Sequence, residues 1–347
     1  MTILAIESSC DETAASLIEV ADDGVITTLR TNIVASQIEI HAQYGGVVPE
    51  VAARNHVLTL ISVLSEGLQG ARPEAIAVTG GPGLITSLLV GVEAARALAY
   101  AWDVPLIRVN HLAGHIYANL YDITEPIEYP AICLLVSGGH TELVLLPSEG
   151  EFQVIGATRD DAVGEVFDKV GKMLGLGYPG GPLVSKKAAN GNAQAFVLPR
   201  PMLDSGDLDF SFSGLKTAVR YAIRDYKKEQ GVDEVLPEAI IADLCASFQE
   251  AVIDTLVAKT LVAARRLKVK TLLFGGGVMA NSALRERLTS VLPKELPALR
   301  FSMPSLQVCT DNAAMIAAAA SVQVRNNGLS GDWRAVKADP QWEFNRG

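Results

Sequence analysis

The chain has 347 residues, of which 49% are hydrophobic and 20% are charged, and its 29 lysine and arginine residues stand against 39 aspartate and glutamate residues. This composition is typical of a globular α/β protein long enough for two lobes, and it excludes a disordered chain. Because the net charge is −10 and proteins that grip nucleic acid unaided are usually basic, any nucleic-acid contact must use a local patch or a partner's surface.

Two pairs of short apolar segments are predicted to form β-strands, each pair joined by a tight polar turn. The first pair covers residues 2–7 and 13–20, and the second covers residues 131–137 and 141–147. The two pairs can be laid over each other with Ser8 upon Ser137. This faint internal repeat predicts two related lobes with a cleft between them.

Helices and strands alternate between these two pairs. The predicted order is helix 51–69, strand 75–79, helix 85–101 and strand 106–109. Alternation of this kind predicts a mostly parallel sheet covered by helices.

Beyond about residue 158 the pattern changes to long helices broken by glycine-rich loops. Predicted helices cover residues 161–174, 213–228 and 237–266, and residues 178–182 are predicted to lie in a loop. A strand at 271–274 and a triple-glycine turn then lead into a helix that starts near Asn281. No linker rich in serine or proline separates the lobes, so we expect a closely packed pair with a hinge.

The sequence predicts neither a signal peptide nor a membrane span. The N-terminal segment lacks a basic region, and the apolar stretch from Ala313 to Val322 is too short to cross a bilayer. The cysteines are widely spaced, which argues against disulfides or a cysteine-rich zinc site and fits a reducing cytosol. Buried, inert thiols are expected for all four: Cys10, Cys133, Cys245 and Cys309.

His111 and His115 are four residues apart, so on a helix they project from the same face and can reach one metal ion. A single carboxylate from elsewhere would complete a His-His-Asp set with open positions, which suits Fe(II) or Zn(II). Thr310-Asp311-Asn312 follows much later in the chain. Two ordinary polar or capping residues are the alternative interpretation of the pair.

Glycine-rich turns follow several predicted strands. Ser137-Gly138-Gly139 can present backbone N–H groups to a phosphate, and the turn from Gly275 to Asn281 opens a helix whose N-terminus favours a nucleotide. Tight connections are the alternative for both turns. Because neither a Walker lysine motif nor a GxGxxG fingerprint is present in the sequence, P-loop and dinucleotide binding are not supported.

Two carboxylates and one basic stripe have competing interpretations. Asp11 can hold a water-bound cation near a phosphate or serve as an Asx-turn residue, and Asp168 can take ribose hydroxyls or pair with Lys172. The stripe is the best local candidate for a nucleic-acid contact, although a solvated helix face is the commoner explanation of such a pattern. It consists of Lys216, Arg220, Arg224, Lys227 and Lys228.

Six motifs, in one order, resemble a single family, the tRNA N6-adenosine threonylcarbamoyltransferases (TsaD/Gcp family) of the actin–hexokinase–acetate kinase fold. The similarity runs from residue 3 to about residue 325. The motifs are IESSCDET (6–13), GGVVPE (45–50), GPGL (81–84), NHLAGH (110–115), LVSGGHT (135–141) and GGGVMAN (275–281).

The resemblance implies two ribonuclease H-like lobes with an interlobe nucleotide cleft. The first lobe would span residues 1–130, completed by a C-terminal helix at 308–327. The second would span 131–307 with a helical insertion at 158–266. The implied metal ligands are His111, His115 and Asp311, and the implied substrate-binding residues are Leu135, Val136, Ser137, Gly138, Gly139, Asp168, Gly181 and Asn281. Some members carry an acidic residue where this chain has Ser185, which puts the ribose contact there in question.

The resemblance also implies the reaction: transfer of threonylcarbamoyl from threonylcarbamoyl-AMP to N6 of adenosine 37 in tRNAs that read ANN codons. It implies one divalent metal, Fe²⁺ in the first place and Zn²⁺ as the alternative, and an adenine nucleotide. In this mechanism we expect Asp11 to have a supporting electrostatic or proton-handling role. Implied partners are tRNA, a TsaB-type paralogue, a TsaE-type ATPase and a TsaC-type enzyme that supplies the adenylate, all in the cytoplasm and away from membranes.

Three other functions compete with this one. A metalloprotease would need glutamate after the first histidine, where Leu112 stands. A sugar or acetate kinase of the same fold would have no use for a His-His-Asp site. A non-catalytic scaffold of the same tRNA-modification complex would lack the histidine pair.

Overall fold

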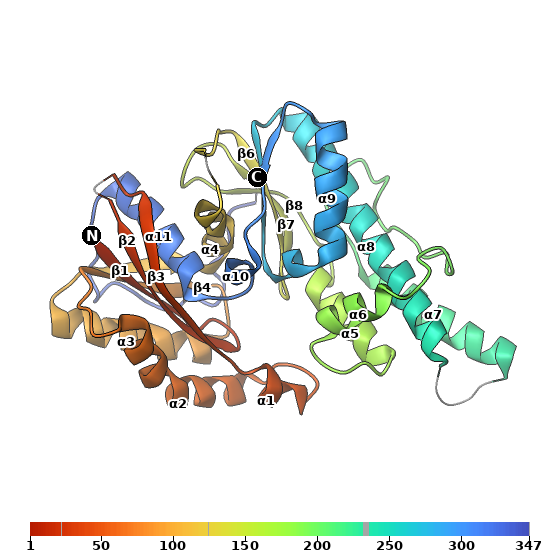
Figure 1. Cartoon of the computed structure of the whole chain (residues 1–347), viewed down its shortest axis with the longest axis horizontal. Coiled ribbons are helices and arrows are strands. Elements are labelled where there is room, and N and C mark those ends of the chain that lie inside the picture. Colours follow the sequence, from red (N-terminus) through yellow and green to blue (C-terminus); the bar gives the residue numbers. More distant parts are fainter. Residues whose placement is uncertain (22, 124, 232–235, 347) are drawn as a thin grey trace. The chain divides into compact units, whose positions relative to one another are not determined.

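The computed structural model describes residues 1–21, 23–123, 125–231 and 236–346 (Figure 1). It divides into two compact units that are interleaved along the chain. The first unit comprises Met1–Pro126, Ser148–Phe152 and Ser302–Asn345, and the second comprises Ile127–Pro147, Gln153–Phe301 and Arg346–Gly347.

The first unit is built on a five-stranded sheet with the order β3-β2-β1-β4-β5. β1 pairs antiparallel with β2 and parallel with β4, and β4 pairs parallel with β5, as the alternation of helices and strands predicts. The strands are β1 (Thr2–Glu7), β2 (Glu12–Val20), β3 (Ile26–Ser36), β4 (Ala75–Gly81) and β5 (Leu106–Asn110).

Helices cover both faces of this sheet, which explains why its central strands are apolar on both sides. The face with Ile3 and Ala5 packs against α4 and α11, whereas the face with Leu4 and Ile6 packs against α2 and α3. The helices of the unit are α1 (Ile38–Ala42), α2 (Pro49–Leu68), α3 (Ile85–Trp102), α4 (His111–Tyr117), the 3-10 turn η1 (Ala118–Tyr121), α10 (Leu306–Cys309) and α11 (Ala313–Asn327).

The apolar stretch Ala313–Val322 forms most of α11, and all ten of its residues are buried. Its alanine side chains are short enough to let the helix lie close to β1 and β2. Within the described residues no helix is both long and apolar enough to cross a membrane.

The second unit repeats the first. Its sheet has the order β10-β9-β6-β7-β8, in which β6 pairs antiparallel with β7 and parallel with β9. Ser8 and Ser137 each directly follow the first strand of their sheets, so the predicted repeat is confirmed. The strands are β6 (Ala131–Val136), β7 (Thr141–Leu146), β8 (Gln153–Ala157), β9 (Thr271–Gly275) and β10 (Arg300–Ser302).

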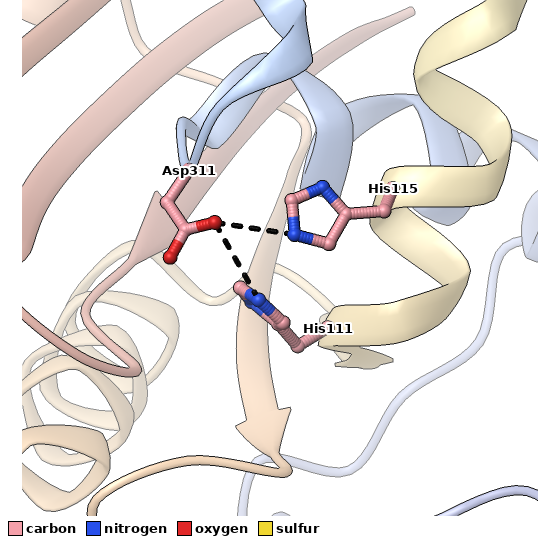
Figure 2. Close-up of side chains that lie close together, drawn as sticks. All are labelled: His111, His115 and Asp311. Carbon is pink, nitrogen blue, oxygen red and sulfur yellow. Dashed lines mark ion pairs between the residues drawn. The ribbon is translucent and has the colours of Figure 1, made fainter. Parts of the chain in front are cut away.

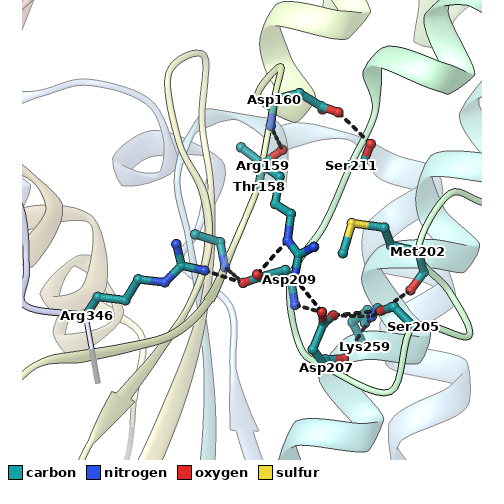
Figure 3. A network of polar contacts seen from close by, with 11 residues as sticks. Thr158, Arg159, Asp160, Met202, Ser205, Asp207, Asp209, Ser211, Lys259 and Arg346 are labelled. Atoms are coloured by element: carbon teal, nitrogen blue, oxygen red, sulfur yellow. Dashed lines mark hydrogen bonds and ion pairs between the residues drawn. The ribbon is translucent and has the colours of Figure 1, made fainter.

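The second unit also carries the long helices predicted between its strands. They are α5 (Val163–Met173), α6 (Gly180–Ala188), α7 (Ser213–Gln230), α8 (Glu238–Leu267), the 3-10 turn η2 (Gly277–Ala280) and α9 (Ser282–Glu295). An ion-pair network secures the segment before α7: Lys259 of α8 is 2% exposed and donates to Asp207, while Arg159 and Arg346 both pair with Asp209 (Figure 3).

Two predictions from the sequence are wrong. The segment 178–182 is not entirely a loop, because α6 already begins at Gly180. An added Cβ at Gly180 would lie 2.5 Å from the carbonyl oxygen of Phe167, so only glycine allows α6 to start this close to α5. Cys133, Cys245 and Cys309 are buried free thiols as predicted, but Cys10 is only half-buried because it lies in the loop between β1 and β2.

Candidate metal centre and nucleotide pocket

The histidine pair opens α4, directly after β5. The side-chain oxygen of Asn110 accepts hydrogen bonds from the backbone N–H groups of Leu112 (2.8 Å) and Ala113 (3.3 Å), which caps the helix. His111 is 7% exposed and His115 is fully buried. The cap fixes where the helix begins and therefore which way both imidazoles point.

Asp311 reaches the histidine pair from the segment that leads into α11. Its Oδ1 lies 3.1 Å from Nε2 of His115 and 3.7 Å from Nε2 of His111. Figure 2 marks both pairs with dashed lines. The ligand atoms of the three residues all lie within 4.8 Å of one another. The structure therefore brings together the three residues that the family resemblance implies as metal ligands.

Glu7 contacts Nδ1 of His111, the ring nitrogen that does not face Asp311. Its Oε2 lies 3.1 Å from Nδ1 of His111 and also accepts a hydrogen bond from the Thr79 hydroxyl at 2.6 Å. Burial opposes a charge on His111, but the Glu7 and Asp311 carboxylates outweigh it and raise the pKa of His111 to about 9. The same pairing with His111 overcomes the burial of Glu7 and lowers the pKa of that carboxyl.

This carboxylate–imidazole pair leaves Nε2 of His111 directed toward Asp311, which is the usual arrangement behind a metal-binding histidine. Both ring nitrogens of His115 are buried. Neither makes a hydrogen bond within the described part of the chain, and the contact of Nε2 with the Asp311 carboxylate is an ion pair only if His115 is protonated. Two imidazoles and one carboxylate are a donor set that suits Fe²⁺ or Zn²⁺ and leaves coordination positions for a substrate. The residues present thus fit a catalytic divalent metal.

The loop between β1 and β2 adds further carboxylates to this region. Asp11 is 8% exposed, and the neighbouring Glu12 accepts a hydrogen bond from the Ser36 hydroxyl. Burial, together with the charges of Asp11 and Asp311, raises the pKa of the Glu12 carboxyl well above its usual range. Sequence reasoning did not single out Glu7 or Glu12; an acidic residue ending an apolar strand is the signal that could have found Glu7.

A cavity of about 610 Å³ lies within the second unit, between α5, α6 and the turn before α9. Of the predicted substrate-binding residues, Gly138, Asp168, Gly181 and Asn281 line it. Ser137 and Gly139 flank Gly138 in the loop after β6. Leu135 and Val136 lie in β6 itself and are fully buried, so they do not line this cavity.

Asp168 and Asn281 are held in place by the elements around the cavity. Asp168 accepts a hydrogen bond of 2.7 Å from the backbone N–H of Gly180, at the start of α6. Asn281 caps α9 by accepting from Leu284 N–H, while its side-chain amide donates to Gln249 at 2.7 Å. Ser185 and Lys186 also line the cavity, so the serine that departs from the family pattern lies beside the other predicted contacts.

The shared strand order of the two sheets, the glycine-lined cavity and the His-His-Asp cluster define a class: two-lobed α/β proteins of the actin-like ATPase fold, here with three side chains whose grouping suits a metal ion. Comparison with known proteins specifies the class further. The family model "TsaD: tRNA N6-adenosine threonylcarbamoyltransferase" matches residues 28–318, and the chain belongs to this family. A protein of Desulfitobacterium hafniense with that name is 50% identical over 325 residues, which cover 92% of this chain and 91% of the relative.

Solved structures agree on the fold. A nucleotide- and phosphate-bound HypF aligns with a TM-score of 0.59 at 13% identity over 95% of this chain, which spans 56% of the HypF chain. The activator of 2-hydroxyisocaproyl-CoA dehydratase from Clostridium difficile, with bound ADPNP, aligns with a TM-score of 0.51 at 13% identity, over 94% of this chain and 96% of the activator. The predicted fold class is confirmed.

Proposed function

We propose that this chain transfers the threonylcarbamoyl group from threonylcarbamoyl-AMP to N6 of adenosine 37 in tRNAs that read ANN codons. The observation that carries the proposal is the cluster of His111, His115 and Asp311 in a member of the threonylcarbamoyltransferase family. The cavity lined by Asp168 and Asn281 supports it, since its size suits an adenine nucleotide.

The chemistry must act mainly on the electrophile, because the N6 lone pair of adenosine is conjugated with the purine ring and the amine is a weak nucleophile. His111, His115 and Asp311 would hold a divalent metal, and such a metal would supply a Lewis acid to polarise the carbonyl that is attacked. Glu7 keeps the proton on Nδ1 of His111, so that Nε2 remains the ligand atom. We assign Asp11 a supporting electrostatic or proton-handling role at the same centre.

The residues of the second unit bind and orient the nucleotide. We assign the phosphate to the backbone N–H groups of the loop around Gly138 and Gly139, where missing Cβ atoms permit close approach. Asp168 accepts from the ribose hydroxyls, and Gly181 and Asn281 contact the remainder of the nucleoside. Such binding supplies orientation and proximity rather than covalent chemistry.

The metal, the partners and the location complete the proposal. Fe²⁺ is the expected metal, and Zn²⁺ fits the same ligands. A TsaC-type enzyme supplies threonylcarbamoyl-AMP, and a TsaB-type paralogue and a TsaE-type ATPase assist turnover in the cytoplasm. The retained histidine pair argues against a non-catalytic scaffold, and Leu112 after His111 argues against a zinc peptidase.

The test is incorporation of radiolabelled threonine into tRNA by the purified chain with TsaB-, TsaC- and TsaE-type partners. His111→Ala is expected to abolish incorporation, whereas Leu306→Ala, an exposed substitution on the nearby helix α10, is expected to leave it intact. Binding of AMP to both variants, measured by calorimetry, checks that the nucleotide pocket is unaffected. A His111→Ala protein that still modifies tRNA at the rate of the unaltered chain refutes the metal-dependent mechanism.

A further inference from the structure

Helix α7 concentrates positive charge in a chain whose net charge is −10. Between Ser213 and Gln230 it carries five basic and two acidic residues. Leu215 and Val219 are buried and fix one face of the helix against the second unit. Arg220, Arg224 and Lys228 follow at intervals of four, so they share one face, and all three are exposed.

The exposed cations of α7 differ from other cations of the same unit in that few of them have an ion-pair partner. Lys216 pairs with Asp161, and Arg200 pairs with Asp254, so their charges are neutralised locally. Arg159, Lys259 and Arg346 are likewise committed to the aspartate network of Figure 3. On α7, by contrast, Arg224 has only the adjacent and exposed Asp225, and among the described residues no ion pair involves Arg220 or Lys228.

An aromatic ring lies among these charges. Tyr221 is 44% exposed, and the guanidinium carbons of Arg220 and Arg224 lie 5.6 Å and 4.7 Å from its ring centroid. RNA-binding surfaces combine cations that contact phosphates with aromatic rings on which bases stack, and arginine adds cation–π contacts to them. We call Arg220, Tyr221, Arg224 and Lys228 the α7 basic face.

We propose that the α7 basic face binds the sugar-phosphate backbone of the tRNA substrate. The inference rests on the proposed function, which makes tRNA the substrate, and names the surface that receives it. An anionic membrane fits less well, because the apolar side of α7 is buried against its own unit and cannot enter a bilayer. Figure 1 shows α7 at the margin of the second unit, and Arg220, Arg224 and Lys228 are all exposed.

The experiment uses the full chain and two variants with the same change in net charge. Arg220→Gln/Arg224→Gln/Lys228→Gln alters the α7 basic face, and Lys268→Gln/Lys270→Gln/Lys294→Gln alters three exposed lysines elsewhere in the second unit. Dissociation constants for unmodified tRNA are measured by filter binding at several salt concentrations. We expect the first variant to bind about tenfold or more weakly at 0.15 M salt, with the magnitude of the slope of log K against log [salt] reduced by about 3. The second variant is expected to bind like the unaltered chain.

Tyr221 supplies a second measurement that net charge does not influence. Tyr221→Ala is expected to weaken tRNA binding about 5-fold or more, and Tyr221→Phe to restore it, because stacking needs only the ring. In the reconstituted reaction the first triple variant should raise KM for tRNA and leave KM for threonine unchanged. Equal tRNA affinity of the two triple variants overturns the proposal. The proposal is also overturned if the first triple variant keeps its tRNA affinity but loses binding to anionic vesicles or to the TsaB-type partner.

The two proposals fail separately. If the unaltered chain with its partners does not incorporate threonine, the proposed function is wrong, while the filter-binding comparison still decides whether the α7 basic face binds RNA. If incorporation occurs and the first triple variant matches the unaltered chain in KM and in tRNA affinity, only the assignment of α7 is wrong.

Discussion

Replacing Glu7 by glutamine should change how the candidate metal centre exchanges protons. In the metal-free chain the pKa of His111 is raised to about 9 by Glu7 and Asp311, against the effect of burial. At pH 7.5 a group with that pKa is about 97% protonated, so binding of a metal at Nε2 must release about one proton. Glu7→Gln keeps the shape of the side chain but removes its charge, and the pKa of His111 should then fall toward 6.5. Proton release at pH 7.5 should drop to about 0.1.

Affinity alone would be a poor readout of this change. The unaltered chain loses about 30-fold in apparent affinity at pH 7.5 to the proton that it must release, and Glu7→Gln is spared this loss. Removing the carboxylate behind a ligating histidine, however, costs about 10- to 100-fold in metal affinity. The two effects oppose each other near neutral pH, whereas proton release separates them.

The assay is isothermal titration of the metal-free protein with Zn²⁺ at pH 7.5 in buffers of different ionisation enthalpy, which yields the number of protons released. Thermal unfolding of the metal-free chain gives an independent check. Because the folded-state pKa of His111 exceeds its unfolded value of about 6.5, the stabilisation is complete below pH 6.5 and is lost as pH rises through 9. Glu7→Gln should lack this loss. Equal proton release by both proteins would refute the role assigned to Glu7.

Three further outcomes are expected. Ile316→Ala removes a fully buried side chain from α11 and should cost about 2–5 kcal/mol of unfolding free energy in urea titrations; a cost below 1 kcal/mol would contradict the packing described. Gly138→Ala should leave the melting temperature unchanged, because no atom lies within 4 Å of the added Cβ, and it should weaken AMP binding because the added methyl group enters the cavity. Gly276→Ala should instead lower the melting temperature, because Gly276 has a φ of +91° and an added Cβ would lie 2.3 Å from the carbonyl oxygen of Val136. Asp168→Ala should weaken AMP binding about tenfold or more but leave 2′,3′-dideoxy-AMP binding nearly unchanged, and equal losses for both nucleotides would argue against a ribose contact.

The strands of both sheets could be predicted where burial on two faces makes them continuously apolar, as in β1 and β6. β3 escaped prediction because it is an edge strand with mostly exposed or half-buried residues and polar side chains on both faces. α6 escaped because it begins with two glycines and Pro182, residues that signal a loop, although proline is tolerated in the first turn of a helix. The local sequence pattern does not show that the start of α6 lies so close to α5 that only glycine fits there.

The residues of the candidate site likewise fall into those that local sequence predicts and those that only the tertiary fold brings together. The spacing of His111 and His115 predicts a shared face from local geometry alone. Asp311 and Glu7 lie far from the pair in sequence, and only the packing of α11 and β1 around α4 brings them to it. Family resemblance supplied Asp311, but no pattern in the sequence indicated that Glu7 would contact His111.

The interleaving of the first unit has a consequence for the order of events during synthesis on the ribosome. Residues 1–126 leave the ribosome early, but the helix that covers one face of their sheet lies beyond residue 302. The second unit, nearly continuous from 127 to 301, can therefore mature while the first still exposes the apolar face that includes Ile3 and Ala5. Asp311 arrives with the helix that closes this face, so the nascent chain cannot bring the third residue of the candidate metal centre to the histidine pair until the burial of this face is nearly complete. Binding of a metal ion by the incomplete nascent chain is thereby disfavoured.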